Sequence, residues 1–511
     1  MLAKVASLSV NGIDGFLIQI EVDLGLGMPS FDIVGLPDLA VKEARDRVRA
    51  AIKNSKLCFY DHRITVNLAP ANVKKEGSSF DLPIAVGILA AKGDCQMEEK
   101  LSQTAFVGEL ALDGAVRPVI GALSMALATR SAGLKYLVLP KINLAEVLVV
   151  KGITPIPVED LRQVLNFLNN NWMPEVETPQ QTESEENSFN AEYDMLDVKG
   201  QEQAKRALEV AAAGGHNILM LGPPGSGKTM LAKRLPGILP SLCEEESLAL
   251  TKIYSVSGLL LPGASLIKTR PFRAPHHSTS AAGLIGGGRI PRPGEVSLAH
   301  FGVLFLDELA EFNREVLEVL RQPLEDGKVT IARAAMTLSF PAQFMLASAM
   351  NPCPCGFLGD PQRTCSCTPN QIRRYQGRIS GPLLDRFDLQ IEVPRMADFE
   401  LDQVPQGETS QVIRQRVEAA RQIQRMRFVG TSHFCNAHMS SKEIREYCQL
   451  NQNGKELLRQ AVQRFFLSAR AYTRILKLAR TIADLEGKVQ LELTHLAEAI
   501  QYRSLDRKGF V

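Results

Sequence analysis

A complete phosphate-loop motif at residues 222–229 constrains this chain more than any other feature. The motif follows G-x-x-x-x-G-K-[ST] and consists of Gly222, Pro223, Pro224, Gly225, Ser226, Gly227, Lys228 and Thr229. Its glycines let backbone N–H groups converge on phosphate oxygens, Lys228 can reach the β- and γ-phosphates, and the Thr229 hydroxyl can ligate Mg²⁺. An apolar run at 217–221 precedes the motif and a helix-forming run at 230–234 follows it. This order predicts a parallel α/β core that binds ATP and Mg²⁺.

Two later apolar strands end in polar residues that suit hydrolysis. Residues 303–306 lead into Asp307 and Glu308, and residues 343–347 lead towards Asn351. We expect Asp307 to complete the Mg²⁺ shell and Glu308 to orient and deprotonate the attacking water. Asn351 is expected to hydrogen-bond that water or the γ-phosphate, with a turn-capping role as the alternative.

Length and composition set wider limits. A chain of 511 residues predicts two to four domains, and 45% apolar and 22% charged residues are typical of a globular protein. No apolar stretch is long enough to span a bilayer, and the N-terminus lacks a signal-peptide pattern, so we expect a cytoplasmic protein without a membrane partner. The nine cysteines, four of them clustered, favour thiols or a metal site over disulfides.

Charge is unevenly distributed along the chain. Residues 172–195 contain no Lys or Arg and seven acidic residues, a composition typical of an exposed linker. Basic residues outnumber acidic ones after residue 196, although the net charge of the whole chain is only +2. This excess favours a polyanionic partner, and a mildly basic surface without such a partner is the alternative.

The segment before the linker alternates predicted strands and helices. Residues 16–22, 63–68 and 136–139 have strand character, and residues 38–54, 81–92 and 121–131 have helical character. Asp113-Gly114 predicts a hairpin between two further strands, at residues 106–112 and 115–119. We therefore predict four parts: an α+β domain at 1–171, the acidic linker at 172–195, an ATPase core at 196–395 and a helical lid at 396–511.

The first domain resembles the proteolytic domain of Lon, a Ser–Lys peptidase with a ribosomal-S5-like fold. The resemblance rests on residues 75–79, the Asp113-Gly114 hairpin and the helix that follows it. Ser79 falls at the position of the Lon nucleophile, whereas Ser124 stands where the general-base lysine should be. An unassisted serine hydroxyl is almost wholly protonated at neutral pH, so we predict a domain of this fold without peptidase activity.

The rest of the chain resembles magnesium-chelatase-like AAA+ ATPases, and the whole chain is similar to the bacterial ComM/YifB family. The segments that carry this resemblance are residues 31–38, 75–84, 222–229, 270–277, 294–300 and 383–388. The resemblance implies an S5-like domain fused to an AAA+ core with a helical lid. It also implies a homo-hexameric motor that drives branch migration on DNA during natural transformation.

The same resemblance suggests two arginines that complete the ATP site. Arg386 matches the finger that, in related motors, reaches the nucleotide of the neighbouring subunit, and a salt bridge to Asp385 or Asp388 is the alternative. Arg470, on a predicted lid helix, is the expected γ-phosphate sensor, and Arg474 is the second choice.

Four cysteines form the pattern Cys-x-Cys-x9-Cys-x-Cys: Cys353, Cys355, Cys365 and Cys367. Four thiolates satisfy tetrahedral Zn²⁺, although the spacing within each pair is shorter than usual. A structural zinc site and a cluster of reduced thiols both remain open.

A glycine-rich segment around residues 283–288 is surrounded by arginines. The candidate DNA contacts are Arg270, Arg273, Arg289 and Arg292. The resemblance implies hairpins here that face the pore of a ring, where arginine could grip phosphates. Ion pairs at a subunit interface are the alternative.

The sequence is compatible with three candidate functions of different classes. The first is a hexameric ATPase that translocates on DNA. The second is the motor subunit of a metal chelatase, which acts on a protein partner. The third, an ATP-dependent protease, is disfavoured by Ser124.

Overall fold

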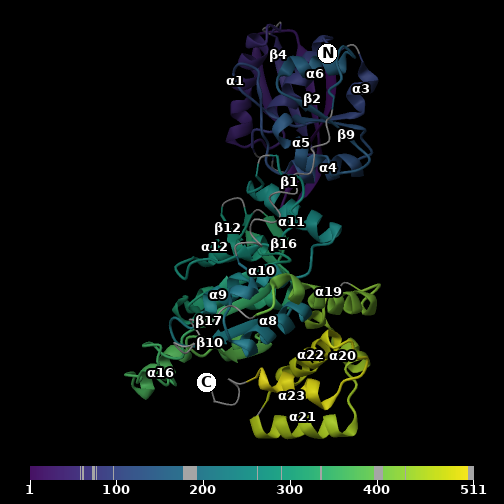
Figure 1. The fold of residues 1–511 in the computed structure, drawn as a ribbon. Coiled ribbons are helices and arrows are strands. Elements are labelled where there is room, and N and C mark those ends of the chain that lie inside the picture. The colour runs from purple at the N-terminus through teal and green to yellow at the C-terminus, as the bar shows by residue number, and fades with distance from the viewer. Residues whose placement is uncertain are drawn as a thin grey trace. The chain divides into compact units, whose positions relative to one another are not determined.

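The computed structural model describes residues 1–57, 59, 62–71, 75, 77–95, 97–175, 193–261, 263–288, 291–333, 336–395, 407–431, 433–465 and 467–503 (Figure 1). Most of the predicted linker and the candidate Arg289 lie outside these residues. The chain divides into two compact units. Unit 1 contains residues 1–181 and 247–267, and unit 2 contains residues 182–246 and 268–511.

Unit 1 is built on a seven-stranded mixed sheet with the order β3-β4-β2-β1-β5-β8-β9. Its strands are β1 (Leu2–Asn11), β2 (Asp14–Gly25), β3 (Ser30–Val34), β4 (Arg63–Ala69), β5 (Thr104–Phe106), β8 (Tyr136–Pro140) and β9 (Thr154–Val158). The pairs β1–β2 and β2–β4 are antiparallel, and the other pairs are parallel. A short hairpin of β6 (Glu109–Leu110) and β7 (Val116–Arg117) lies around Asp113-Gly114, as predicted.

Helices cover both faces of this sheet, because the strands alternate their apolar side chains. In β1, Val5 belongs to one core and Leu8 to another. The first core also contains residues of α1 (Leu39–Asn54), α2 (Asp81–Lys92) and α6 (Leu161–Leu168), and the second contains residues of α4 (Ala122–Ser131) and α5 (Leu144–Val147). An alternating strand with two buried faces requires helices on each side.

A segment from the predicted ATPase core packs within unit 1. It comprises residues 247–267 and includes most of α11 (Glu244–Ser257). The Ser255 hydroxyl donates to the Glu146 carboxylate at 2.6 Å, and Lys252 lies 2.7 Å from Asp14. Sequence periodicity does not predict this grouping, since it depends on contacts between residues far apart in the chain.

Unit 2 contains a five-stranded parallel sheet with the order β11-β14-β17-β10-β18. Its strands are β10 (Ile218–Leu221), β11 (Phe272–Arg273), β14 (Val303–Leu306), β17 (Met345–Met350) and β18 (Leu389–Glu392). The residues of β10, β14 and β17 are buried throughout, as continuous apolar runs in a parallel sheet should be. The flanking helices include α8 (Glu202–Gly214), α9 (Lys228–Lys233) and α10 (Leu235–Ile238), and α16 (Pro369–Gln376) lies in the connection from β17 to β18.

Two hairpins are inserted between the strands of unit 2. The glycine-rich segment forms β12 (Gly286–Gly287) and β13 (Arg292–Pro293), which pair antiparallel. A second, longer hairpin consists of β15 (Lys328–Arg333) and β16 (Met336–Pro341). The first insertion was predicted as a hairpin; the second was not, although the alternating apolar residues at 329, 331, 338 and 340 are a strand signal.

The C-terminal region of unit 2 is helical, as predicted. It consists of α19 (Ser410–Arg427), α20 (Ser441–Tyr447), α21 (Gln452–Phe465), α22 (Ala469–Leu485) and α23 (Leu493–Gln501) (Figure 1). Its apolar residues join those of the sheet in one core. Within the described residues, no helix has both the length and the apolar character needed to cross a bilayer. The predicted class, a mixed α/β multidomain protein with a parallel core and a helical region, is confirmed.

Two glycines in β2 test how tightly α4 packs on the sheet of unit 1. A Cβ added at Gly15 would lie 2.3 Å from the Ser124 carbonyl oxygen, whereas a Cβ at Gly25 would have no atom nearer than 3.9 Å. We expect Gly15→Ala to lower the free energy of unfolding of unit 1 by about 1–3 kcal/mol. The control Gly25→Ala should change it by less than about 0.5 kcal/mol. Equal melting temperatures for the two variants in calorimetry would contradict this packing.

Candidate active site

The carboxyl ends of three adjacent parallel strands bring the predicted hydrolytic residues together. β17 lies between β14 and β10 in the sheet and pairs with both. Asp307 and Glu308 follow β14, Asn351 follows β17, and the phosphate loop follows β10. Ligands of open α/β sheets bind at this edge.

The phosphate loop requires glycine at three positions. A Cβ at Gly222 would lie 2.2 Å from the Val393 carbonyl oxygen, which follows the neighbouring strand β18. Gly225 and Gly227 adopt φ values of +77° and +86°, in the left-handed region that favours glycine. The loop therefore takes a shape in which larger residues would clash or be strained.

Lys228 lies inside this loop. Its ammonium donates to the carbonyl oxygens of Gly222 and Pro223 at 2.7 and 2.8 Å and to the Asn351 side-chain oxygen at 3.4 Å. Burial lowers the pKa of Lys228 to about 8, against the opposing influence of Asp307 and Glu308. The ammonium is thus held at the loop by neutral oxygens that a triphosphate could replace.

The two predicted Mg²⁺ ligands are in contact. The Thr229 hydroxyl donates to the Asp307 carboxylate at 2.7 Å. The oxygens of Thr229 and Asp307, with the exposed Glu308 carboxylate next to Asp307 in the chain, fit the hard cation Mg²⁺. In proteins this ion keeps several waters and binds substrate phosphates. The donor set therefore fits the ion that the phosphate loop implies.

Glu308 has an unusual backbone and a partner that the sequence did not predict. Its φ is +52°, which is rare for a residue other than glycine and is typical of functional sites. The His277 ring lies 3.7 Å from its carboxylate and packs against the His276 ring at 4.0 Å between ring centroids, with the planes tilted by 35°. This partner is not evident from the sequence, because Glu308 is distant from His277 along the chain.

Gln201 also contacts the phosphate loop. Its side-chain amide donates to the Ser226 carbonyl oxygen at 2.7 Å, and its own backbone has a φ of +55°. Its side-chain oxygen is buried without a hydrogen-bond partner.

Arg386 and Arg470 meet at a different carboxylate. Arg386, which is 4% exposed, lies 2.7 Å from Glu325 and donates to the Pro382 carbonyl oxygen. Arg470 lies 3.5 Å from the same oxygen of Glu325. None of these partners belongs to the phosphate loop. The alternative partners Asp385 and Asp388 are not those observed for Arg386.

Arg474 has a structural role. It pairs with Asp388 and donates to the Arg386 carbonyl oxygen at 2.9 Å. Asp388 also contacts the buried His216 ring at 3.2 Å. Arg474 thus ties α22 to the residues that follow Arg386, which favours Arg470 over Arg474 as the sensor.

The four candidate DNA contacts have different environments. The Arg270 side chain is 9% exposed; it pairs with Glu246 at 2.9 Å and donates to backbone oxygens, so its guanidinium already has partners within this chain. Arg273 forms two hydrogen bonds with Glu295, at 2.6 and 2.7 Å. Arg292 is exposed on β13. Arg289 lies outside the described residues.

The hairpin β15–β16 supplies a further exposed arginine, Arg333. A Cβ added at Gly287 of the hairpin β12–β13 would lie 3.8 Å from the Arg333 guanidinium. The two inserted hairpins are therefore neighbours, and both carry exposed arginine. Sequence reasoning missed Arg333 because it did not recognise the second hairpin.

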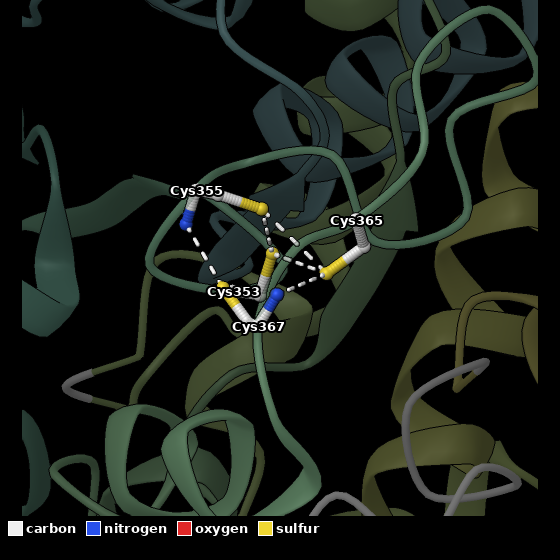
Figure 2. Close-up of side chains that lie close together, drawn as sticks. All are labelled: Cys353, Cys355, Cys365 and Cys367. Carbon is white, nitrogen blue, oxygen red and sulfur yellow. Dashed lines mark hydrogen bonds between the residues drawn. The ribbon is translucent and has the colours of Figure 1, made fainter.

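The four clustered cysteines converge in a loop between β17 and α16 (Figure 2). Their sulfur atoms all lie within 4.8 Å of one another. The described cysteines form no disulfide. Of the two interpretations left open by the sequence, the geometry favours a metal site.

In unit 1, the Ser124 side chain is buried and donates to the Ile13 carbonyl oxygen at 2.7 Å. Lys75 is also buried and contacts the Pro70 carbonyl oxygen. Ser124 stands where a Lon-type peptidase has its general base, and its hydroxyl is instead hydrogen-bonded to the backbone of this domain.

The pKa of Lys228 predicts how nucleotide binding depends on pH. Below about pH 8 the ammonium is charged and attracts phosphate, and above it the charge is lost. We expect the affinity for MgATP to fall by about an order of magnitude between pH 7 and pH 9. Fluorescence titration with a nucleotide analogue measures this, and Lys228→Met should bind weakly at every pH. A wild-type profile as flat as that of the variant would contradict the assignment.

Comparisons with known proteins cover both units. Models described as "Magnesium chelatase, subunit ChlI", "Subunit ChlI of Mg-chelatase" and "Magnesium chelatase, subunit ChlI C-terminal" match residues 194–401, 20–143 and 407–503. The magnesium-chelatase 38 kDa subunit of Rhodobacter capsulatus is 24% identical over an alignment of 222 positions, which covers 40% of this chain and 56% of that subunit.

Two full-length relatives are more similar. The chain is 47% identical over 509 residues to the competence protein ComM of Haemophilus influenzae, a match that covers 99% of this chain and 98% of that protein. It is 44% identical over 511 residues to the protein YifB of Escherichia coli, with coverage of 99% and 98%. The chain therefore belongs to the ComM/YifB family of magnesium-chelatase-like AAA+ proteins.

Proposed function

We propose that this protein is a ring-forming ATPase that couples ATP hydrolysis to translocation on DNA, driving branch migration in recombination during natural transformation. The observation that carries the proposal is the separation of two clusters. Lys228, Thr229 and Asp307 lie at one end of the parallel sheet, whereas Arg386 and Arg470 share Glu325. We propose a cytoplasmic homo-hexamer as the working form.

The residues at the sheet edge divide the chemistry among them. Lys228 and the loop N–H groups bind the β- and γ-phosphates, and Thr229 with Asp307 holds Mg²⁺. Mg²⁺, when bound, neutralises charge on the phosphate oxygens. Glu308 takes a proton from the attacking water, and Asn351 orients that water or the γ-phosphate.

Arg386 and Arg470 complete the site of the neighbouring subunit. A guanidinium neutralises charge that develops on the transferring phosphoryl group. Both arginines pair with Glu325, and among the described residues neither forms a hydrogen bond or ion pair with its own phosphate loop, which supports a role in trans for the pair. Hydrolysis then requires a ring, because no subunit supplies all parts of its own site.

Two lines of support point to DNA as the load. The relative from Haemophilus influenzae is named a competence protein. Arg292 and Arg333 are exposed on neighbouring hairpins, and exposed arginines of this kind bind phosphates without reading sequence.

Two further parts of the protein have supporting roles in this proposal. Zn²⁺ at the cysteine cluster has a structural role, and the N-terminal domain acts without peptidase activity.

A metal-chelatase motor is the second candidate. The family models named after the chelatase subunit ChlI favour it. In that case the ATPase would act on a protein partner rather than on DNA. Stimulation of ATP hydrolysis by DNA distinguishes the two candidates.

Mixed rings test whether the site is shared. Lys228→Ala and Arg386→Ala should each lower the ATPase rate by about 10³-fold or more when expressed alone. Co-expressed in equal amounts, they should recover about a quarter of the wild-type rate, since about a quarter of randomly mixed interfaces combine an intact loop with an intact finger. The measurement is the steady-state ATPase rate of the purified mixture.

The control mixes Arg386→Ala with a chain that carries both substitutions. This mixture contains intact phosphate loops but no intact finger, so its rate should remain at the level of Arg386→Ala alone. Absence of recovery in the first mixture, despite mixed rings detected by mass spectrometry, would show that Arg386 does not act in trans.

The DNA load is tested by the ATPase rate with and without forked DNA. We expect forked DNA to raise the wild-type rate several-fold, with a stimulation that weakens as salt increases. Arg292→Ala combined with Arg333→Ala should remove most of the stimulation. The matched control is Arg459→Ala, which removes an exposed arginine on the lid helix α21 and should leave the stimulation intact.

Single-stranded and duplex DNA complete the comparison. If none of the three DNA forms stimulates hydrolysis by the wild-type protein, the chelatase-type reading is favoured instead. If the hairpin variant is stimulated as strongly as Arg459→Ala, the two hairpins are not the DNA contact.

A further inference from the structure

The four-cysteine cluster has the geometry of a metal site. The Sγ atom of Cys353 lies 3.3 Å from that of Cys355 and 3.6 Å from that of Cys365, and the latter two are 3.6 Å apart. Zinc bound to four thiolates at about 2.3 Å in a tetrahedron separates the sulfurs by about 3.8 Å. Only small side-chain shifts would admit the ion.

Backbone donors already point at these sulfurs. The N–H of Cys355 donates to the Cys367 sulfur at 3.4 Å, and the N–H of Cys367 donates to the Cys365 sulfur at 3.4 Å (Figure 2). Such hydrogen bonds stabilise the thiolate form, which a metal requires. Four protein ligands also close a tetrahedral shell, so the site is structural rather than catalytic.

The metal would join the two ends of one irregular loop. Cys353 and Cys355 lie at its start, directly after Asn351, and Cys365 and Cys367 lie at its end, directly before α16. The loop contains no helix or strand between residues 351 and 368. A long loop without regular structure needs a cross-link to hold one shape, and metal ligation at both ends provides it.

This loop touches the phosphate loop. Gly356 adopts a φ of +84°, and a Cβ there would lie 2.6 Å from the Pro224 ring. Asn351, two residues before Cys353, contacts the Lys228 ammonium at 3.4 Å. The cysteine loop therefore lies against the phosphate loop and begins at the residue that contacts Lys228, so a change in its shape can reach Asn351.

We propose that the four cysteines bind one Zn²⁺ ion per chain, and that this ion sets the position of Asn351 and so controls the rate of ATP hydrolysis. The second part rests on the proposed ATPase function. The zinc displaces the thiol protons and bonds to four thiolate sulfurs. Loss of the ion frees the loop that begins at Asn351, while the phosphate-binding N–H groups of residues 222–229 keep their own glycine-determined shape.

The first measurement is the metal content of the full chain. We expect about one zinc per subunit by elemental analysis, and near zero in a Cys365→Ser/Cys367→Ser variant. The matched control is Cys243→Ser, a cysteine outside the cluster, which should retain the zinc. Less than about half a zinc per wild-type chain, after purification with zinc present, would overturn the site.

The second measurement separates turnover from nucleotide binding. Removal of zinc by a chelator, or the double cysteine variant, should lower kcat by about tenfold or more and change the Kd for ATP by less than about threefold. Return of zinc should restore kcat in the stripped wild type but not in the variant. Unchanged kcat after complete zinc removal would contradict the proposal that the ion controls the rate of ATP hydrolysis.

Hydrogen exchange tests the same coupling without using catalysis. On zinc removal, amides of residues 351–358 should exchange faster, whereas those of the β-strands in unit 1 should not change. Unchanged exchange at 351–358 would overturn the link between zinc and Asn351. If the zinc-loaded chain binds zinc and shows this exchange pattern but does not hydrolyse ATP, the proposed function fails while the metal site stands.

Discussion

The parallel pairing of β17 with both β10 and β14 is the constraint on which the rest of unit 2 depends. This pairing places the ends of three strands side by side, so that Asn351 lies between the phosphate loop and Asp307. The contacts of Lys228 with Asn351 and of Thr229 with Asp307 follow from it. A change in strand order would separate these side chains without altering any local motif, because each motif belongs to a different strand.

The charged groups of unit 2 divide into clusters with different surroundings. Lys228 is buried near two carboxylates, which accounts for the opposing influences on its pKa. The cluster at Glu325 gathers two arginines that the phosphate loop does not contact. In the proposed ring, a neighbouring nucleotide would compete with Glu325 for these arginines. Glu325 would then act as their counter-ion before the neighbour binds, and so keep a buried guanidinium such as Arg386 paired.

Local patterns in the sequence predicted much of both units. The strands β10, β14 and β17 of the parallel sheet were found from continuous apolar runs, and α1, α2 and α4 from helical periodicity, because these signals depend only on neighbouring residues. The hairpin at Asp113-Gly114 was found from turn chemistry. Short strands such as β5, and the grouping of residues 247–267 with unit 1, were not predicted, since their pairing depends on residues far away in the chain. The residue types of the phosphate loop, Asp307 and the clustered cysteines were likewise evident from the sequence.

The sequence by itself determined which chemistry is available: a loop for phosphates, carboxylates for Mg²⁺ and water, thiols for a soft metal, and arginines for anions. Only the tertiary structure decided how each group is used. It paired Arg270 with Glu246, joined His277 to Glu308, and brought Arg386 and Arg470 to one carboxylate. It also gathered four sulfurs from both ends of a loop that contacts the phosphate loop. Motifs fix residue types along the chain, but burial and charge pairing depend on long-range packing, which no single segment encodes.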